Sequence, residues 1–379
     1  MSDTYTLYGS YASYYTAKTR SYLRKKGIPF VERLPSDPMF RNKVRPSSGS
    51  HRIPQLLTPA GTVIQDSVEI LDHLETAFPE LPAFPATPRL RTFVHLMELL
   101  ASEGLVQLAW LHRWLFAENR DFVLMDFGRS FRPQGSDAEL REYGQLIADR
   151  MMSYGLPEST PELRDKLDAE YLALLRLFEA HLIEHPYLLG GHPSAADYAL
   201  MGALHAHMGR DPAGLRIMQQ HAPRTFRWME HMLVPEVQSP EFYQVPVAYP
   251  ADDEVPATAR ALMLHIAEKY GRGFVLSCLA FNQYVADQQP QPGQPLDAER
   301  DQPTLPTVQL SHGGATVEHG ANLHHVWLAQ RAQRYLQSLT AQEQAAVLAM
   351  VGPGMAQELL AVPVAAVLVR EDNRLLIGT

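Results

Sequence analysis

The fold is decided by residues 52–75, which read RIPQLLTPAGTVIQDSVEILDHLE. Two short strands are predicted at 55–58 and 62–65, because the Pro-Ala-Gly step between these two runs is typical of a hairpin. Apolar residues recur at helical spacing from 66 to 78, so this segment predicts a helix, and the proline that follows ends it.

The residues upstream complete a small α/β unit. The pattern over 4–9 predicts a strand, and the pattern over 29–34 predicts a second one. Between them, residues 16–26 predict a helix that stops at a glycine. The order is strand, helix, strand, loop, hairpin, helix, which is too short for a doubly wound sheet. We expect residues 1–80 to form this domain.

Beyond this unit the chain is predicted to be helical. Residues 79–88 contain four prolines in ten residues, which indicates an interdomain linker. We place this linker at 81–88. Residues 89–245 are expected to form an all-α domain, whose clearest element is an apolar stripe over 163–182. Ser194 and Asp197 form a capping box, and the helix that it opens is apolar enough to lie at the centre of this domain.

The last part, residues 246–379, predicts a mostly helical extension. Apolar residues follow helical spacing at 262–274 and at 328–339. Residues 287–306 are polar and proline-rich, which predicts a loop. A small hairpin is predicted at 367–377, around an Asp-Asn pair.

Composition excludes several classes of protein. The 379 residues carry 33 Lys and Arg against 42 Asp and Glu, a net charge of −9, and no long basic run, which argues against nucleic-acid binding. One cysteine, Cys278, excludes a disulfide framework, a CxxC redox pair and a cysteine-rich zinc site; we expect it to be a small buried apolar side chain. No signal peptide is recognisable, and the apolar run at 359–369 is too short to cross a membrane. We therefore expect a cytoplasmic protein without membrane contact.

Four segments carry a resemblance to a known family. They are LYGSYASYYTAKTRSYLRKKGIPF at 7–30, RIPQLL at 52–57, QDSVEILDHLE at 65–75 and YLLGGHPSAADYAL at 187–200. In this order they resemble the soluble glutathione S-transferase superfamily over residues 1–245, and the long extension resembles a bacterial branch of GST-like proteins. The resemblance implies a thioredoxin-like N-terminal domain, an all-α C-terminal domain, a glutathione site between them and a homodimer.

The resemblance also implies which residues hold the cysteinyl and glycyl parts of glutathione. Pro54 would be cis, and the backbone of Ile53 would bind the peptide as an added strand is bound. A trans proline entering an edge strand is the structural alternative. For the glycyl carboxylate a cation is expected in the preceding loop, where Lys43 and Arg52 are equal candidates.

Asp66 and Ser67 lie where a strand passes into a helix, so free backbone amides and a hydroxyl meet there. The resemblance implies that this pair binds the γ-glutamyl end of glutathione, with Asp66 facing the ammonium, Ser67 facing the carboxylate and Gln65 assisting. A capping box of Asp66 with Glu69 is the structural alternative, and the two roles are compatible.

The group that activates the glutathione thiol is expected near the start of the first helix. Register with the family's active site places Ser13 there, as a hydrogen-bond donor to the thiolate and not as a nucleophile. Tyr8, at the end of the first strand, is the second candidate, because some family members donate a phenol. Tyr14 stands where many members have proline. For Ser13 the structural alternative is an ordinary helix cap.

A pocket for the second substrate is predicted from charged and aromatic side chains on one helical segment: Glu103, His112, Arg113 and Trp114. Such a set suits a polar or acidic electrophile. The structural alternative is an ion pair of the Arg113–Glu103 type, with Trp114 in the core. No metal site is predicted, since the neighbouring His324 and His325 are not expected to share one helix face.

Two functions remain open at this stage. The first is a glutathione-dependent enzyme acting on a small-molecule electrophile, as a transferase or as a reductase, peroxidase or lyase, with glutathione as co-substrate and no metal. The second is a non-catalytic GST-like scaffold that works through protein contacts of residues 246–379. Neither the motifs nor the composition identify the electrophile.

Overall fold

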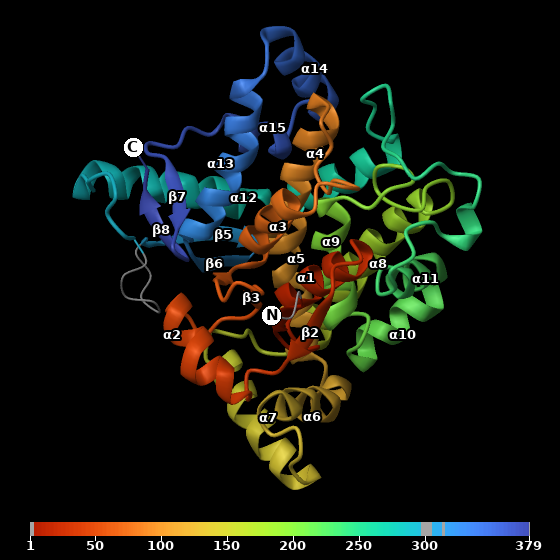
Figure 1. The fold of residues 1–379 in the computed structure, drawn as a ribbon, viewed down its shortest axis with the longest axis vertical. Coiled ribbons are helices and arrows are strands. Elements are labelled where there is room, and N and C mark those ends of the chain that lie inside the picture. Colours follow the sequence, from red (N-terminus) through yellow and green to blue (C-terminus); the bar gives the residue numbers. More distant parts are fainter. Residues whose placement is uncertain (1–3, 297–304, 313–314, 379) are drawn as a thin grey trace. The chain divides into compact units, whose positions relative to one another are not determined.

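A computed structural model of the chain describes residues 4–296, 305–312 and 315–378 (Figure 1). These residues form two compact units: Met1–Ala83 with Leu105–Tyr249, called unit 1 here, and Phe84–Gly104 with Pro250–Thr379, called unit 2. No helix of the described residues has both the length and the apolar character that crossing a membrane requires.

Unit 1 begins with a mixed sheet of strand order β2-β1-β3-β4. Its strands are β1 (Tyr5–Tyr8), β2 (Phe30–Arg33), β3 (Gln55–Leu57) and β4 (Val63–Gln65). β1 pairs parallel with β2 and antiparallel with β3, and β3 pairs antiparallel with β4. Helix α1 (Tyr14–Lys25) makes the crossover and α3 (Ser67–Ala77) follows the hairpin. The predicted thioredoxin-like domain is confirmed.

The segment between β2 and β3 is more regular than predicted. A polar loop was expected there, but η1 (Phe40–Val44) and α2 (Arg45–Ser48) fill part of it. Phe40 and Val44 are buried four residues apart and pack with Tyr8 and Val63, so a local apolar cluster holds this turn of helix against the sheet.

The rest of unit 1 is helical, as predicted. Its elements are α5 (Leu105–Leu115), η3 (Ala117–Asn119), α6 (Arg120–Phe131), α7 (Asp137–Met152), α8 (Pro161–His181), α9 (Ala195–Met201), η4 (Gly202–His207), α10 (Pro212–His221), α11 (Pro223–His231) and η5 (Pro240–Phe242). The predicted capping box opens α9: Asp197 accepts from the backbone and hydroxyl of Ser194 at 2.8 Å each. Every residue of α9 is buried. α9 and η4 pack against α1, so the thioredoxin-like and helical parts share a core.

Unit 2 joins the first helix after the linker to the C-terminal extension. Its elements are α4 (Pro88–Leu99), η2 (Leu100–Gly104), α12 (Ala257–Gln288), β5 (Thr307–His312), β6 (Ala315–Gly320), α13 (Leu323–Ser338), α14 (Ala341–Val351), α15 (Met355–Ala361), β7 (Leu368–Glu371) and β8 (Arg374–Ile377). The hairpin β7–β8 turns at Asp372 and Asn373, both at positive φ, as predicted. The hairpin β5–β6 was not predicted.

Helix α4 packs against α12, α13 and α14. The predicted boundaries at 81–88 and 245–246 do not coincide with the edges of the compact units, because residues 84–104 belong with the extension.

α12 runs unbroken through Gly271, where a β-carbon would lie 2.3 Å from Cγ of Met355 on α15. It ends at the start of the proline-rich segment 287–306, of which residues 297–304 lie outside the described residues. Cys278 is fully buried in this helix, and burial raises the pKa of its thiol to about 12.

Candidate functional site

The register of the sheet brings the predicted glutathione residues to one edge. Tyr8 lies opposite Gln55, and Gln55 lies opposite Gln65. The residues that follow or precede these pairs are therefore neighbours at the same end of the three strands: Gly9 after β1, Pro54 before β3 and Asp66 after β4. The sequence segments at 7–30, 52–57 and 65–75 meet here.

Ser13 is the N-cap of α1, at this same edge. Its Oγ accepts a hydrogen bond from the Thr16 backbone N–H at 3.3 Å, and its own N–H donates to the Ser10 carbonyl at 3.2 Å. A hydroxyl that accepts in a cap still carries a proton to donate. The cap and a donor role toward a bound thiolate are therefore compatible, and the side chain is partly exposed.

Gly9 lets β1 end close to the start of α1. A β-carbon at this position would lie 2.2 Å from Cγ2 of Thr16, so no larger residue fits without displacing the first turn of the helix. The glycine thereby fixes how near the loop 9–13 comes to the α1 N-terminus.

Tyr8 is poorly placed to donate to a ligand. Only 2% of it is exposed, and its ring packs on Phe40 with centroids 5.5 Å apart. Burial raises the pKa of its phenol, the charge of Asp37 raises it further, and Arg33 opposes them. A buried phenol with a raised pKa is held in its neutral form.

The Ile53-Pro54 peptide bond is cis, as predicted. The loop before it is held by a residue that the sequence did not single out: Gln55 is fully buried, and its Nε2 donates to the carbonyls of Ser50 and Arg52 at 2.8 Å each. A glutamine at the start of a short, otherwise apolar strand was the only signal for this role.

Asp66 adopts a backbone conformation that is rare outside glycine, with φ at 91° and ψ at 135°. Its side chain accepts from the Val68 backbone N–H at 2.8 Å and caps α3, whose first residue, Ser67, is buried. Non-glycine residues held in such conformations cluster at functional sites. Gln65, the last residue of β4, is partly exposed beside them.

The two cations expected for the glycyl carboxylate lie in different surroundings. Both Lys43 and Arg52 are exposed. Lys43 Nζ lies 3.8 Å from the β-carbon position of Gly61, in the turn of the β3–β4 hairpin, whereas Pro54 lies at the other end of these strands. Arg52 precedes Pro54 by two residues, at the end of the strands where Gly9 and Asp66 lie.

The residues predicted to line a pocket for the second substrate fall in both units: His112, Arg113 and Trp114 lie on α5 of unit 1. Glu103 belongs to unit 2, where its carboxylate lies 3.5 Å from Nε2 of both His324 and His325. His112 is buried, with Nε2 3.0 Å from Asp168. His324 and His325 were not expected to share one helix face; in the first turn of α13 each nevertheless lies near a different oxygen of the Glu103 carboxylate. Among the described residues, no three potential metal ligands are grouped suitably.

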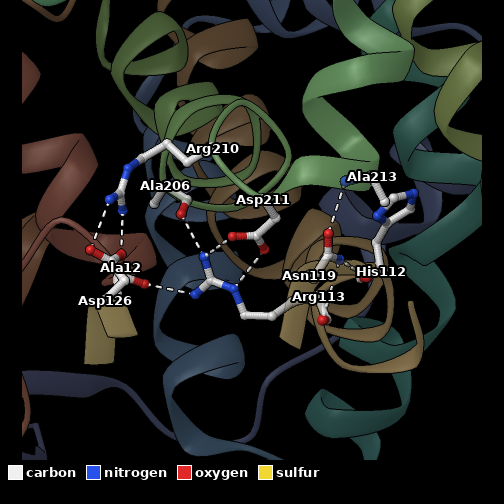
Figure 2. A network of polar contacts seen from close by, with 9 residues as sticks. All are labelled: Ala12, His112, Arg113, Asn119, Asp126, Ala206, Arg210, Asp211 and Ala213. Carbon is white, nitrogen blue, oxygen red and sulfur yellow. Dashed lines mark hydrogen bonds and ion pairs between the residues drawn. The ribbon is translucent and has the colours of Figure 1, made fainter. Parts of the chain in front are cut away.

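Arg113 is buried in a network of polar contacts (Figure 2). Its Nε and Nη2 donate to the two carboxylate oxygens of Asp211 at 2.7 and 2.9 Å, and both side chains are almost fully buried. Arg113 therefore forms a structural ion pair, as the alternative to a substrate pocket expected, but its partner is Asp211 and not Glu103. Trp114, stacked on Phe127 at 5.9 Å, is the one predicted pocket residue of α5 that keeps some exposed surface.

Two family models match the chain. The model of the glutathione S-transferase N-terminal domain matches residues 7–82, and that of the glutathione S-transferase C-terminal domain matches residues 161–231. No curated protein matches the sequence.

Several solved structures are similar to the chain. A glutathione S-transferase from Methylobacterium radiotolerans JCM 2831, in complex with glutathione sulfonate, is 22% identical, with 67% of this chain and 100% of that chain covered and a TM-score of 0.35. A glutathione transferase family member from Pseudomonas fluorescens Pf-5, with two glutathione bound, is 17% identical, with 64% and 94% covered and a TM-score of 0.37. The β-etherase LigF from Sphingobium sp. strain SYK-6 is 22% identical, with 60% and 94% covered and a TM-score of 0.41.

Proposed function

Because the chain belongs to the glutathione S-transferase superfamily through residues 7–82 and 161–231, we propose that it binds glutathione and stabilises its thiolate for attack on a small-molecule electrophile. The observation that carries this proposal is the sheet edge where Gly9, Pro54 and Asp66 lie side by side, with the Ser13 hydroxyl at the adjoining helix start.

Glutathione is a short peptide with two carboxylates and one ammonium, and each group has a counterpart at this edge. The backbone of Ile53 takes the cysteinyl unit, and Arg52 takes the glycyl carboxylate. The Asp66 carboxylate takes the ammonium, and Ser67 at the N-terminus of α3 takes the γ-glutamyl carboxylate, with Gln65 assisting. Lys43 is the less favoured alternative to Arg52.

Ser13 then acts on the sulfur. A free thiol has a pKa of about 8.5, and a donated hydrogen bond together with the positive end of α1 favours the thiolate over the thiol. The thiol proton passes to solvent. The thiolate electron pair forms the new bond to the electrophile, and the leaving group departs with its own electron pair. A transferase follows most directly; a reductase, peroxidase or lyase would use the same thiolate.

A scaffold function is the second candidate, and one observation favours it. Residues 84–104 and 250–379 form a compact unit that neither family model matches. If the protein does not activate glutathione while unit 2 is folded, the result would favour this second function, in which unit 2 binds another protein.

The proposal includes a homodimer in a reducing cytoplasm, where glutathione keeps thiols reduced. Light scattering should give twice the chain mass of 42.6 kDa. A mass of one chain at micromolar concentration would contradict the homodimer without touching the glutathione site.

The function is tested at Ser13. The Ser13→Ala variant should bind glutathione with nearly unchanged affinity but raise the pKa of the bound thiol, because the donor to the thiolate is lost. The ultraviolet absorbance of the thiolate, followed against pH, measures this pKa. Tyr8→Phe is the matched control and should leave it unchanged. A shift in Tyr8→Phe with none in Ser13→Ala would transfer the role to Tyr8.

A further inference from the structure

Two arginine–aspartate pairs, one buried and one partly exposed, lie beside the loop that carries Ser13 (Figure 2). Arg113 of α5 pairs with Asp211, and Arg210 pairs through both its Nη atoms with Asp126 of α6, at 2.7 and 2.9 Å. Since Arg210 and Asp211 are consecutive, one dipeptide before α10 is tied to both α5 and α6. We call these four residues the double ion pair.

The double ion pair contacts the loop at two successive residues. Arg113 Nη1 donates to the Ala12 carbonyl at 2.9 Å, and its Nη2 also donates to the Ala206 carbonyl at 2.7 Å. The guanidinium of Arg210 lies 5.5 Å from the centre of the Tyr11 ring, a cation–π distance. Ala12 is buried. A charged group from the helical part of unit 1 thus holds the backbone immediately before Ser13.

Holding the Ala12 carbonyl orients Ser13. The Ala12 carbonyl and the Ser13 N–H belong to one planar peptide unit, so a fixed carbonyl fixes the direction of that N–H and the start of the Ser13 backbone. Arg113 can do this because its planar guanidinium donates in several directions at once, and Asp211 locks its plane through two parallel bonds.

We propose that Arg113, locked by Asp211, is a positioning residue that aims the Ser13 hydroxyl at the glutathione sulfur. The inference rests on the proposed function, since it concerns the same hydroxyl. Arg113 touches no reacting atom in this account. Its effect reaches the thiolate only through the Ala12–Ser13 peptide.

A purely structural role for Arg113 is the alternative, and the network supplies a matched control. Asn119 is fully buried in the same network: its Nδ2 donates to the backbone carbonyls of His112 at 2.9 Å and Arg113 at 3.4 Å, and its Oδ1 accepts from the Ala213 backbone N–H at 2.9 Å. It ties α5 to α10 as Arg113 does, but none of its hydrogen bonds reaches the loop. Asn119→Ala should therefore cost stability without misplacing Ser13.

The experiment compares Arg113→Lys with Asn119→Ala. Lysine keeps the charge, but its single nitrogen cannot replace the hydrogen bonds of Arg113 to Asp211, Ala206 and Ala12 together. The Ala12–Ser13 peptide should therefore lose its fixed orientation, and the Ser13 hydroxyl should no longer point at the sulfur. We expect the pKa of the bound glutathione thiol to rise in Arg113→Lys and kcat to fall about tenfold or more, with KM for glutathione little changed. Asn119→Ala should lower the melting temperature but leave the thiol pKa at the wild-type value. If Arg113→Lys does not fold, Asp211→Asn replaces it in the experiment. Asparagine has nearly the same shape as aspartate but cannot accept both hydrogen bonds that hold the Arg113 guanidinium.

Equal thiol pKa values in Arg113→Lys and wild type, or equal rises in both variants, would overturn the positioning role. Hydrogen exchange of the ligand-free variants separates this failure from failure of the proposed function. Amides 13–17 should exchange faster in Arg113→Lys than in wild type or Asn119→Ala. If the wild-type protein does not bind glutathione, the proposed function fails. The exchange measurement still decides whether Arg113 orders the loop before Ser13. Unchanged exchange of amides 13–17 in Arg113→Lys would refute that ordering as well.

Discussion

Asp66 caps a helix and is proposed to bind glutathione, and a substitution can separate the two roles. It caps α3 while occupying a left-handed backbone conformation, and we assign it the glutathione ammonium. Asparagine caps a helix as well as aspartate and tolerates positive φ, but it carries no charge. Asp66→Asn should weaken glutathione binding about tenfold, which corresponds to about 1.4 kcal/mol, and leave the melting temperature nearly unchanged.

Asp66→Ala serves as the matched comparison, because it removes the cap together with the charge. It should weaken binding by a similar factor and also lower the free energy of unfolding by about 1 kcal/mol. Calorimetric titration and thermal melting of both variants test this. Wild-type affinity in Asp66→Asn would show that the carboxylate serves only the helix.

At this scale the sequence predicted residues whose role follows from their neighbours in the chain. Ser13 precedes a helix, Pro54 precedes a strand, and Asp66 joins a strand to a helix; local pattern together with the family resemblance predicted the cis bond and the helix caps. Gln55 was missed although its partners, Ser50 and Arg52, lie within five residues of it. Arg113 was expected in a pocket, because its partner is set by the fold. Asp211 is 98 residues from Arg113, and no local pattern connects them.

At the scale of elements, Glu103 joins the π-helical turn η2 to the first turn of α13. Burial alone would raise the pKa of this carboxyl, but hydrogen bonds and charge interactions with His324 and His325 outweigh it and lower the pKa to about 2, from an ordinary value of 4.5. The folded state therefore binds this proton less tightly than the unfolded state. Glu103 should contribute stability above pH 4.5, and this contribution should disappear as the pH falls toward 2.

The prediction is measured as melting temperature against pH. The wild-type protein should lose more stability between pH 4.5 and pH 2 than Glu103→Gln, which has no proton to take up at this position. A variant with both histidines replaced by glutamine leaves burial to dominate, so its carboxyl should favour the protonated form and the acid-side trend should reverse. Identical pH profiles for wild type and Glu103→Gln would contradict the linkage.

Element types were largely predictable and their assignment to units was not. The stripe that became α8, the capping box before α9 and the Asp-Asn hairpin all follow from short-range pattern. The association of α4 with α12, α13 and α14 joins segments more than 150 residues apart, which periodicity cannot encode. The hairpin β5–β6 lay beside a polar, proline-rich stretch whose composition suggested only a loop.

At the scale of the whole molecule, the C-terminal extension covers the first helix after the linker. Phe93, Leu96 and Leu100 are fully buried, and α4 packs against α12, α13 and α14. Removing residues 250–379 would expose this apolar surface to water, at about 25 cal/mol per Å². The truncated protein should aggregate or require detergent.

Removing only residues 363–379, which contain the terminal hairpin, is the control, because it leaves α12, α13 and α14 against α4. This shorter chain should remain soluble. Analytical size exclusion of both truncations distinguishes them. A monodisperse protein after removal of 250–379 would show that the extension is dispensable for folding.

The most direct test of the account is an isothermal titration of the wild-type protein with reduced glutathione. The sheet edge with Pro54 and Asp66, together with the loop that carries Ser13, predicts saturable binding of glutathione at or below millimolar concentration. One molecule should bind per chain. The same titration of Asp66→Asn should show the weaker binding described above. No heat of binding at millimolar glutathione would contradict the central claim.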